Sequence, residues 1–215
     1  MWAGRARLGP LLVGALLVVG AFPGSSSAAL AQRALPPIDQ PVPVPAPAGA
    51  AQQSWLDAPL TNWNPAGRPL PTAPRPDSGS RDPQCASRER EPATAEDQQV
   101  VAAGWGLYST YQAGWDVTIV SGTSDYDGMC RPMGYQVFVF LRGQYAGTIA
   151  PVPMASRADG ALSDVHYFGG DQLTGTFVRY APDDPLCCPS RPSVFVTYRL
   201  VTTPNGPSLQ PVDRT

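Results

Sequence analysis

Apolar and polar residues alternate along most of the C-terminal half of the chain, a period of two that is typical of β-strands. The alternation is found over residues 115–120 and 134–141, and further strand-like runs follow over residues 145–150, 162–168, 175–180 and 193–201. In the last of these segments, one face carries Val194, Val196, Tyr198 and Leu200. The pattern therefore predicts an antiparallel sheet of about six strands.

The strand expected over residues 135–141 differs from the others because both of its faces carry apolar residues. A strand of this kind is usually buried on both sides. We therefore expect it at the centre of the sheet, with one face beneath a helix. The residues Arg142-Gly143-Gln144 then lead into the next strand, which predicts a hairpin.

One short helix is predicted ahead of the strands. Thr94 is followed three residues later by Asp97, which resembles a capping box, and Gly104 is well placed to end the helix. Residues 96–103 lie between these signals and present Val100, Val101 and Ala103 to a core. The predicted fold class is α+β, with one short helix packed on an antiparallel sheet of about six strands and braced by disulfides.

The N-terminal residues have the pattern of a secretory signal peptide. Arg5 and Arg7 precede an unbroken apolar run over residues 11–22, and Ala29-Leu30-Ala31 forms a small-residue cleavage pattern. The run is short for a membrane span, although an uncleaved signal-anchor is the alternative. We expect cleavage near Ala31, a secreted or cell-envelope location, and no membrane insertion of the mature chain.

Residues 32–84 are predicted to form a proline-rich stalk. Prolines alternate over residues 41–47, which favours an extended polyproline-II spacer. Trp55 and Trp63 are unusual in such a segment, because large aromatic side chains gain most when they are buried. We expect Trp63-Asn64-Pro65 to strap onto the folded domain, the alternative being that the aromatics await a partner. The predicted parts are thus a signal peptide (1–31), a stalk with a Trp-containing strap (32–84) and the disulfide-braced α+β domain (85–215).

The charge of the chain restricts its partners. Removal of residues 1–31 leaves 13 arginines, no lysine and 17 acidic residues. Nucleic acids require a basic surface, and anionic lipids attract basic segments. We therefore predict no nucleic-acid partner, and we expect the partner to be an envelope protein or a glycan.

The cysteines Cys85, Cys130, Cys187 and Cys188 form an even set, which in an exported chain predicts disulfides. Three pairings are possible. We expect the two neighbouring cysteines to reach Cys85 and Cys130 separately, because long loops gain most from closure, and we disfavour a Cys187–Cys188 bond. Zinc and redox chemistry are disfavoured because no C-x-x-C spacing is present.

No catalytic, cofactor-binding or metal-binding residues are predicted. His166 is the only histidine and lies near Asp164, but no nucleophile signature accompanies them. The sequence Asp125-Tyr126-Asp127-Gly128 lacks the remaining ligands of a calcium loop and is interpreted as a turn, as is Asp183-Asp184-Pro185.

Several features from Tyr126 onward carry a family resemblance. They are Cys130, the hairpin over residues 137–148 and the Cys187-Cys188 pair followed by residues 194–198. This half is similar to the LppP/LprE family of bacterial envelope lipoproteins. The resemblance implies a location and an architecture and carries no catalytic residue. Such proteins bear a lipid on a cysteine at the cleavage site, whereas positions 24–33 here contain none, so release or another means of retention is expected.

The hypothesis that these features favour is a non-catalytic extracytoplasmic module that binds or stabilises another component of the bacterial cell envelope. The alternative is an extracytoplasmic carboxylate-dependent hydrolase acting on a glycan or a peptide. Two convergent acids in a cleft would favour the hydrolase. An exposed aromatic patch on one sheet face that includes Trp105 or Trp115 would favour the binding module.

Overall fold

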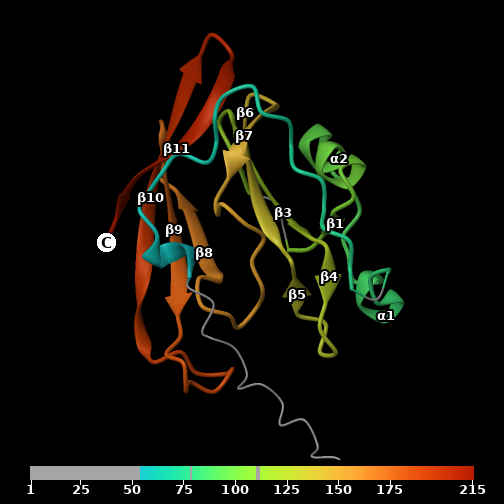
Figure 1. Cartoon of the computed structure of the whole chain (residues 1–215). Helices are drawn as coiled ribbons and strands as arrows, with labels where there is room; N and C mark the ends of the chain where they lie inside the picture. The colour runs from blue at the N-terminus through green and yellow to red at the C-terminus, as the bar shows by residue number, and fades with distance from the viewer. Residues whose placement is uncertain (1–53, 78, 110–111) are drawn as a thin grey trace, which may run out of the picture. The chain divides into compact units, whose positions relative to one another are not determined.

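The computed structural model describes residues 54–77, 79–109 and 112–215. The predicted signal peptide and the proline alternation of residues 41–47 lie outside the described residues. The described part is built mainly from antiparallel sheets with few helices (Figure 1), which confirms the predicted α+β class.

The first sheet has five strands. They are β1 (Gly106–Leu107), β2 (Gln112–Gly114), β3 (Val117–Thr123), β6 (Gln136–Leu141) and β7 (Gln144–Thr148). The order is β1-β3-β6-β7, and β2 pairs with the other end of β3. Arg142 and Gly143 both have positive φ at the β6–β7 turn, which is the backbone of a tight hairpin. The predicted hairpin is therefore confirmed.

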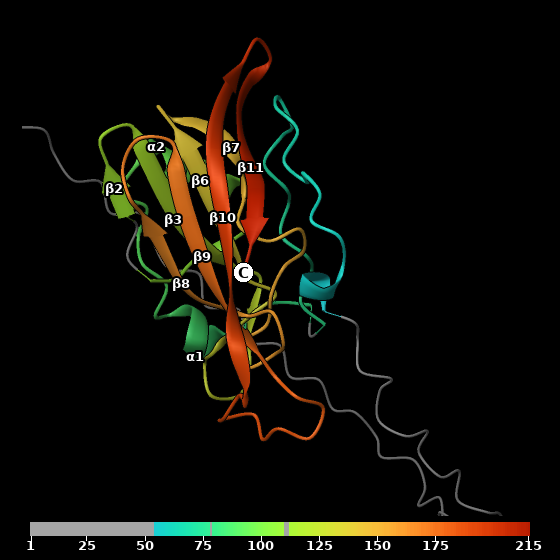
Figure 2. The ribbon, with the colours of Figure 1, turned by 90° about the vertical axis from the view of Figure 1, so that its left-hand side faces the viewer.

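The second sheet has four strands in the order β11-β10-β9-β8. Its strands are β8 (Leu162–Tyr167), β9 (Gln172–Arg179), β10 (Arg191–Thr203) and β11 (Gly206–Arg214). A small ribbon of β4 (Asp125–Tyr126) and β5 (Pro132–Met133) follows β3. Figures 1 and 2 show the two larger sheets stacked, with β7 and β11 as neighbouring edge strands.

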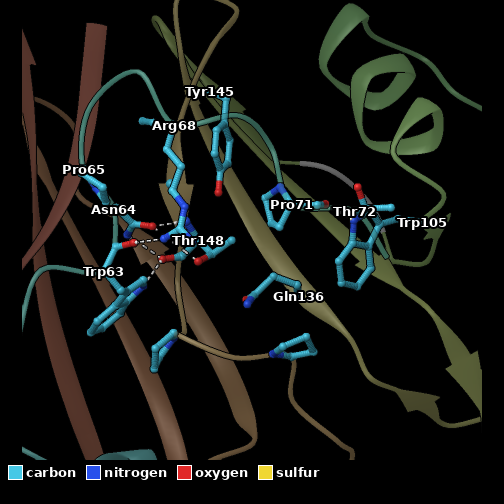
Figure 3. A pocket seen from close by; sticks show the side chains of 14 residues that line it. Trp63, Asn64, Pro65, Arg68, Pro71, Thr72, Trp105, Gln136, Tyr145 and Thr148 are labelled. Atoms are coloured by element: carbon cyan, nitrogen blue, oxygen red, sulfur yellow. Dashed lines mark hydrogen bonds between the residues drawn. The ribbon is translucent and has the colours of Figure 1, made fainter. Parts of the chain in front are cut away.

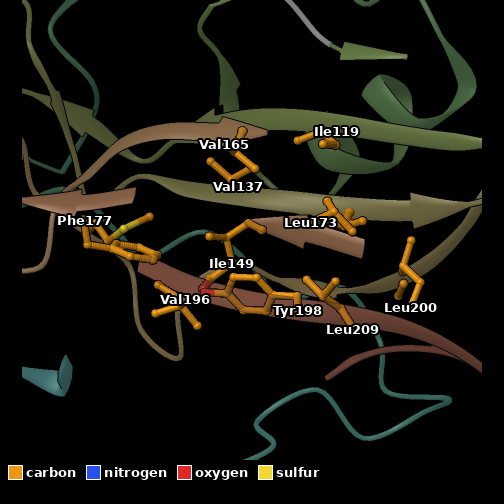
Figure 4. Packing of buried hydrophobic residues seen from close by; sticks show 14 of the residues in the cluster. Ile119, Val137, Ile149, Val165, Leu173, Phe177, Val196, Tyr198, Leu200 and Leu209 are labelled. Carbon is orange, nitrogen blue, oxygen red and sulfur yellow. The ribbon is translucent and has the colours of Figure 1, made fainter. Parts of the chain in front are cut away.

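The main hydrophobic core lies between the two sheets (Figure 4). Alternate residues of the inward faces meet there, among them Ile119, Val137, Ile149, Leu173, Phe177, Val196, Tyr198 and Leu209. Most of these side chains are fully buried. The predicted inward face of residues 194–200 is therefore confirmed, since Val196, Tyr198 and Leu200 are all buried.

A second, smaller core covers the outer face of the first sheet. Helix α2 (Ala95–Ala102) packs there, and its Val100 meets Phe138 and Phe140 of β6 beside Trp105. Ala103 packs partly against this core, but Val101 is 41% exposed, so its predicted place in the core is wrong. The predicted capping box is present, because the Thr94 hydroxyl accepts a hydrogen bond from the Asp97 amide and the Asp97 carboxylate accepts one from the Thr94 amide. β6 thus lies at the centre of the sheet beneath a helix, as its two apolar faces predict.

The expectation of one sheet of about six strands is wrong in its arrangement. A period of two identifies strands, but it does not say how they divide between sheets. The strand β11 was also missed, because Pro207 and Pro211 interrupt its apolar pattern. Prolines are tolerated there because β11 is an edge strand.

The predicted disulfide connectivity is wrong. Cys85 pairs with Cys130, and Cys187 pairs with Cys188. The short helix α1 (Pro83–Ala86) places Cys85 against the turn that follows β4, where Cys130 lies. Cys187 and Cys188 are exposed in the connection between β9 and β10, so they belong to the other sheet. Spatial separation, rather than loop-closure entropy, decides the pairing.

Among the described residues, no helix has the length and apolar character needed to cross a membrane.

Candidate functional site

The strap, defined here as residues 54–77, lies across the edges of both sheets (Figures 1 and 2). It begins with a single turn, η1 (Trp55–Asp57), and then continues without helix or strand. Among the described residues, Ser54 and Leu56 are already buried, about thirty residues before Cys85. Because the strap covers β7 and β11, their backbone groups are shielded from pairing with another chain.

Asn64 joins the strap to both sheets. Its Nδ2 donates to the carbonyl oxygens of Thr148 in β7 (2.9 Å) and Leu209 in β11 (2.8 Å). Its Oδ1 accepts a hydrogen bond from the Thr148 amide at 2.9 Å, and its backbone carbonyl accepts one from the Ser208 hydroxyl. The Asn64 side chain therefore uses its whole hydrogen-bonding capacity as a staple between two edge strands.

The tryptophans of the strap pack on the main core. The Trp63 indole donates to the Thr148 carbonyl at 3.0 Å, and its ring meets Tyr198 edge to face. Trp55 packs edge to face on Phe177. The packing role expected for Trp63-Asn64-Pro65 is confirmed, and the alternative of free aromatics in the strap is wrong.

A cavity of about 210 Å³ lies between the strap and the first sheet (Figure 3). We call it the strap cavity. The strap forms one wall and β6, β7 and the segment after β7 form the other. The residues lining it are Trp63, Asn64, Pro65, Arg68, Pro71, Thr72, Trp105, Gln136, Tyr145, Ala146, Gly147, Thr148, Pro151 and Pro153.

Most polar side chains in these walls are already hydrogen-bonded within the protein. Gln136 donates to two backbone carbonyls and accepts from the Val137 amide. The Trp105 indole donates to the Pro71 carbonyl at 2.8 Å and so holds the strap against the sheet. These bonds give the cavity a rigid frame, and four prolines stiffen it further.

Tyr145 and Arg68 are two polar side chains in the cavity that could still hydrogen-bond to a ligand. Tyr145 points its hydroxyl into the cavity (Figure 3), and burial raises the pKa of that hydroxyl, against the opposing effects of a hydrogen bond with Thr148 and the charge of Arg68. The Arg68 guanidinium donates to the Trp63 carbonyl at 3.2 Å and has further N–H groups to offer. Such an arrangement can bind and orient a polar group.

None of the described residues that line the strap cavity is Asp, Glu, His or Cys. Glycoside hydrolysis by carboxylates needs two acids facing one another across the substrate. The cavity can therefore hold a ligand, but its walls do not supply the groups that would cleave one.

The residues that the sequence singled out for possible catalysis or metal binding do not line the strap cavity. His166 and Asp164 are exposed on β8, and the His166 ring packs against Phe168 with centroids 4.4 Å apart. Asp127 closes a turn, accepting hydrogen bonds from the Met129 and Arg131 amides, and Asp184 does the same for Ala181 and Ser190. The turn interpretation is confirmed for Asp184 and for Asp127, whereas Asp125 and Tyr126 belong to strand β4 rather than to a turn. Within the described ranges, no cluster of three or more His, Cys, Asp or Glu side chains could hold a metal.

The two tryptophans singled out by the sequence differ completely in exposure. Trp105 is 1% exposed and lines the strap cavity from the outer core, whereas Trp115 is 99% exposed at the β2–β3 turn. Trp115 and the exposed Phe168 line a groove of about 330 Å³ along the opposite seam of the two sheets. Trp115 lies on a turn, so the two exposed aromatics do not form the expected patch on a sheet face.

The strap cavity could not be found from the sequence, because its two walls come from segments about 80 residues apart. The signal available was the pair of tryptophans in a proline-rich segment. Only their packing could be inferred from it.

Fold and site together define a two-sheet α+β domain with a disulfide and a small, strap-covered cavity. Residues 109–202 match the model of the LppP/LprE lipoprotein family, which confirms the resemblance of the C-terminal half. The family indicates an envelope-associated, extracytoplasmic location. Comparisons with curated proteins and with solved structures give no match. The matched segment contains Gln136 and the β7 wall of the cavity, while the strap lies outside it.

Proposed function

We propose that this chain is a non-catalytic module of the bacterial cell envelope that binds part of another envelope component in the strap cavity. In this proposal the signal peptide is cleaved near Ala31 and the proline-rich segment that follows is the stalk. The module itself then comprises the strap and the two-sheet domain.

The strap cavity is the observation that carries the proposal. Binding sites in proteins are typically concave and mostly apolar, with a few polar groups that fix the ligand. This cavity has aromatic and proline walls with Arg68 and Tyr145 facing into it. Its volume of about 210 Å³ lies below the roughly 300 Å³ at which pockets for drug-sized ligands begin. It therefore suits a small group, such as one unit or one end of a larger molecule.

Rigidity of the walls supports binding further. The Asn64 staple, the Trp105–Pro71 hydrogen bond and the prolines hold the cavity open without a ligand. A preformed site loses little conformational entropy when the ligand enters. The absence of acidic groups from the described walls favours binding over carboxylate-dependent hydrolysis.

Affinity capture tests the proposal. The exported chain would be immobilised and exposed to a detergent-solubilised fraction of its own cell envelope, and the retained material identified by mass spectrometry. Thr72→Trp places a large ring at the rim of the cavity, because Thr72 is an exposed lining residue. Thr61→Trp is the matched control, since Thr61 is exposed on the same strap and does not line the cavity.

We expect the wild type and Thr61→Trp to retain the same component and Thr72→Trp to lose it. Equal retention by Thr72→Trp would show that the cavity is not the site. Retention of nothing by the wild type would contradict the binding function itself.

A further inference from the structure

We propose that the strap cavity is selective for a small anionic group, a carboxylate or a phosphate on a compact and partly apolar body, with Arg68 as its counter-charge. This inference rests on the proposed function, because it names the chemistry of the ligand that the same cavity would take.

The charge of the cavity comes from one residue. Arg68 is the only ionised side chain among the fourteen lining residues. No carboxylate of the described residues lies within ion-pair distance of it, a property that it shares with several exposed arginines that do not line the cavity. A planar guanidinium has five donors and suits carboxylate and phosphate oxygens. One donor is used by the Trp63 carbonyl, which anchors the group at the cavity.

Tyr145 supplies a second donor to the same place. Its hydroxyl points into the cavity (Figure 3), and Arg68 and Tyr145 line both this cavity and the depression beside it. Burial keeps the phenol protonated, so its O–H can donate to an anion. A guanidinium and a hydroxyl that converge on one region form a site for two oxygens of the same anionic group.

Most of the other N–H donors in the walls are already hydrogen-bonded within the protein. The Trp63, Asn64, Trp105 and Gln136 N–H groups donate to backbone carbonyls of the protein. Ring faces and prolines are thus left to contact the rest of the ligand, which explains the requirement for a partly apolar body.

The surroundings indicate that the anionic group is an end of a larger molecule. Arg68 and Tyr145 also line a wide depression that reaches the β10–β11 turn at Asn205 and the β6–β7 turn at Gly143. No described residue in that depression is acidic. A ligand could place its anionic end in the strap cavity while its remainder follows the depression outward.

Calorimetric titration of the full exported chain at low salt tests the inference with three matched probe pairs. The pairs are N-acetylalanine with its amide, glucuronate with glucose, and glycerol phosphate with glycerol. Each pair compares an anion with a neutral compound of similar shape, and the three pairs separate a peptide carboxylate, a sugar acid and a phosphate ester as the source.

We expect at least one anion to bind tenfold or more tightly than its neutral partner, with an affinity that falls as salt is added. Arg68→Gln should remove that preference, and Tyr145→Phe should reduce it severalfold while leaving the ring in place. Arg75→Gln is the control, because Arg75 is exposed on the same strap and does not line the cavity.

Three results would overturn the inference: equal binding of anion and neutral partner, a preference that survives Arg68→Gln, or no binding of any anion. Capture from the envelope fraction separates this failure from that of the proposed function. If Arg68→Gln retains the component and Thr72→Trp loses it, the cavity still binds but anion selectivity is wrong.

Discussion

The variant Asn64→Ala tests whether the hydrogen bonds of the Asn64 side chain hold the two sheets together. The side chain is 3% exposed and bonds to β7 of one sheet and β11 of the other. Truncation removes those bonds without adding volume. It leaves the Thr148 amide and the Leu209 carbonyl without this partner beneath the strap, while the Thr148 carbonyl keeps its bond from the Trp63 indole.

The expected cost follows from the groups left unpaired. A buried donor or acceptor that loses its partner costs about 1–3 kcal/mol. Because two such groups are left unpaired, we expect Asn64→Ala to lower the free energy of unfolding by about 2–6 kcal/mol. Small domains are typically stable by about 5–15 kcal/mol in total. The Asn64 side chain would therefore account for a large share of the total free energy of unfolding.

Urea denaturation followed by tryptophan fluorescence measures the change. Asn62→Ala is the control, because Asn62 is exposed and contributes one bond, from the Asn64 amide to its Oδ1 at 2.9 Å. We expect a loss of about 1 kcal/mol or less for that variant. A loss below about 1 kcal/mol for Asn64→Ala as well would refute the view that the strap holds the sheets together.

Three further predictions concern the rest of the fold. Gly147→Ala should destabilise the protein, and its effect should not add to that of Asn64→Ala in a double-mutant cycle, because a Cβ at Gly147 would lie 2.3 Å from the Asn64 side chain. Replacing Cys85 and Cys130 together by Ala should lower stability by about 4 kcal/mol in thermal melts, since the bond closes a loop with a sequence separation of 45, and an unchanged melting temperature would contradict this. Burial opposes ionisation of Asp97, but hydrogen bonds from an arginine and two backbone amides outweigh it and hold the pKa of Asp97 below its usual range. The stability that ionised Asp97 contributes is thus present above its unfolded pKa of about 3.9 and is lost as the pH falls through its folded pKa. Asp97→Asn should therefore be less stable than the wild type at pH 7, and this difference in unfolding free energy should shrink below about pH 4 in acid titrations. A difference that stays constant with pH would argue against the ionised pair.

Local signals predicted the elements of this fold well. The capping box of Thr94 and Asp97 and the doubly apolar β6 depend on neighbouring residues only, and both are confirmed. The strand β11 was missed because its prolines weaken the period of two, although Asn205-Gly206 is a hairpin signal just before it. At an edge, position in the sheet overrides strand propensity.

Long-range features were harder to predict. The disulfide pairing depends on which cysteines meet in space, and Cys85 meets Cys130 because the short helix α1 packs near the β4–β5 ribbon. The strap cavity likewise arises only when Arg68 and Tyr145 are brought together by the staple. Aromatic content predicted that the strap packs, but it did not indicate that a space remains beneath it.

The central claim is that a ligand occupies the strap cavity, and the indole N–H signals of the ¹⁵N-labelled chain report on it most directly. Trp63 and Trp105 line the cavity, whereas Trp115 lies in the groove of the opposite seam. Titration with the component captured from the envelope should shift the first two signals and leave that of Trp115 unchanged. A shift confined to Trp115 would contradict the account and move the binding site to the opposite seam.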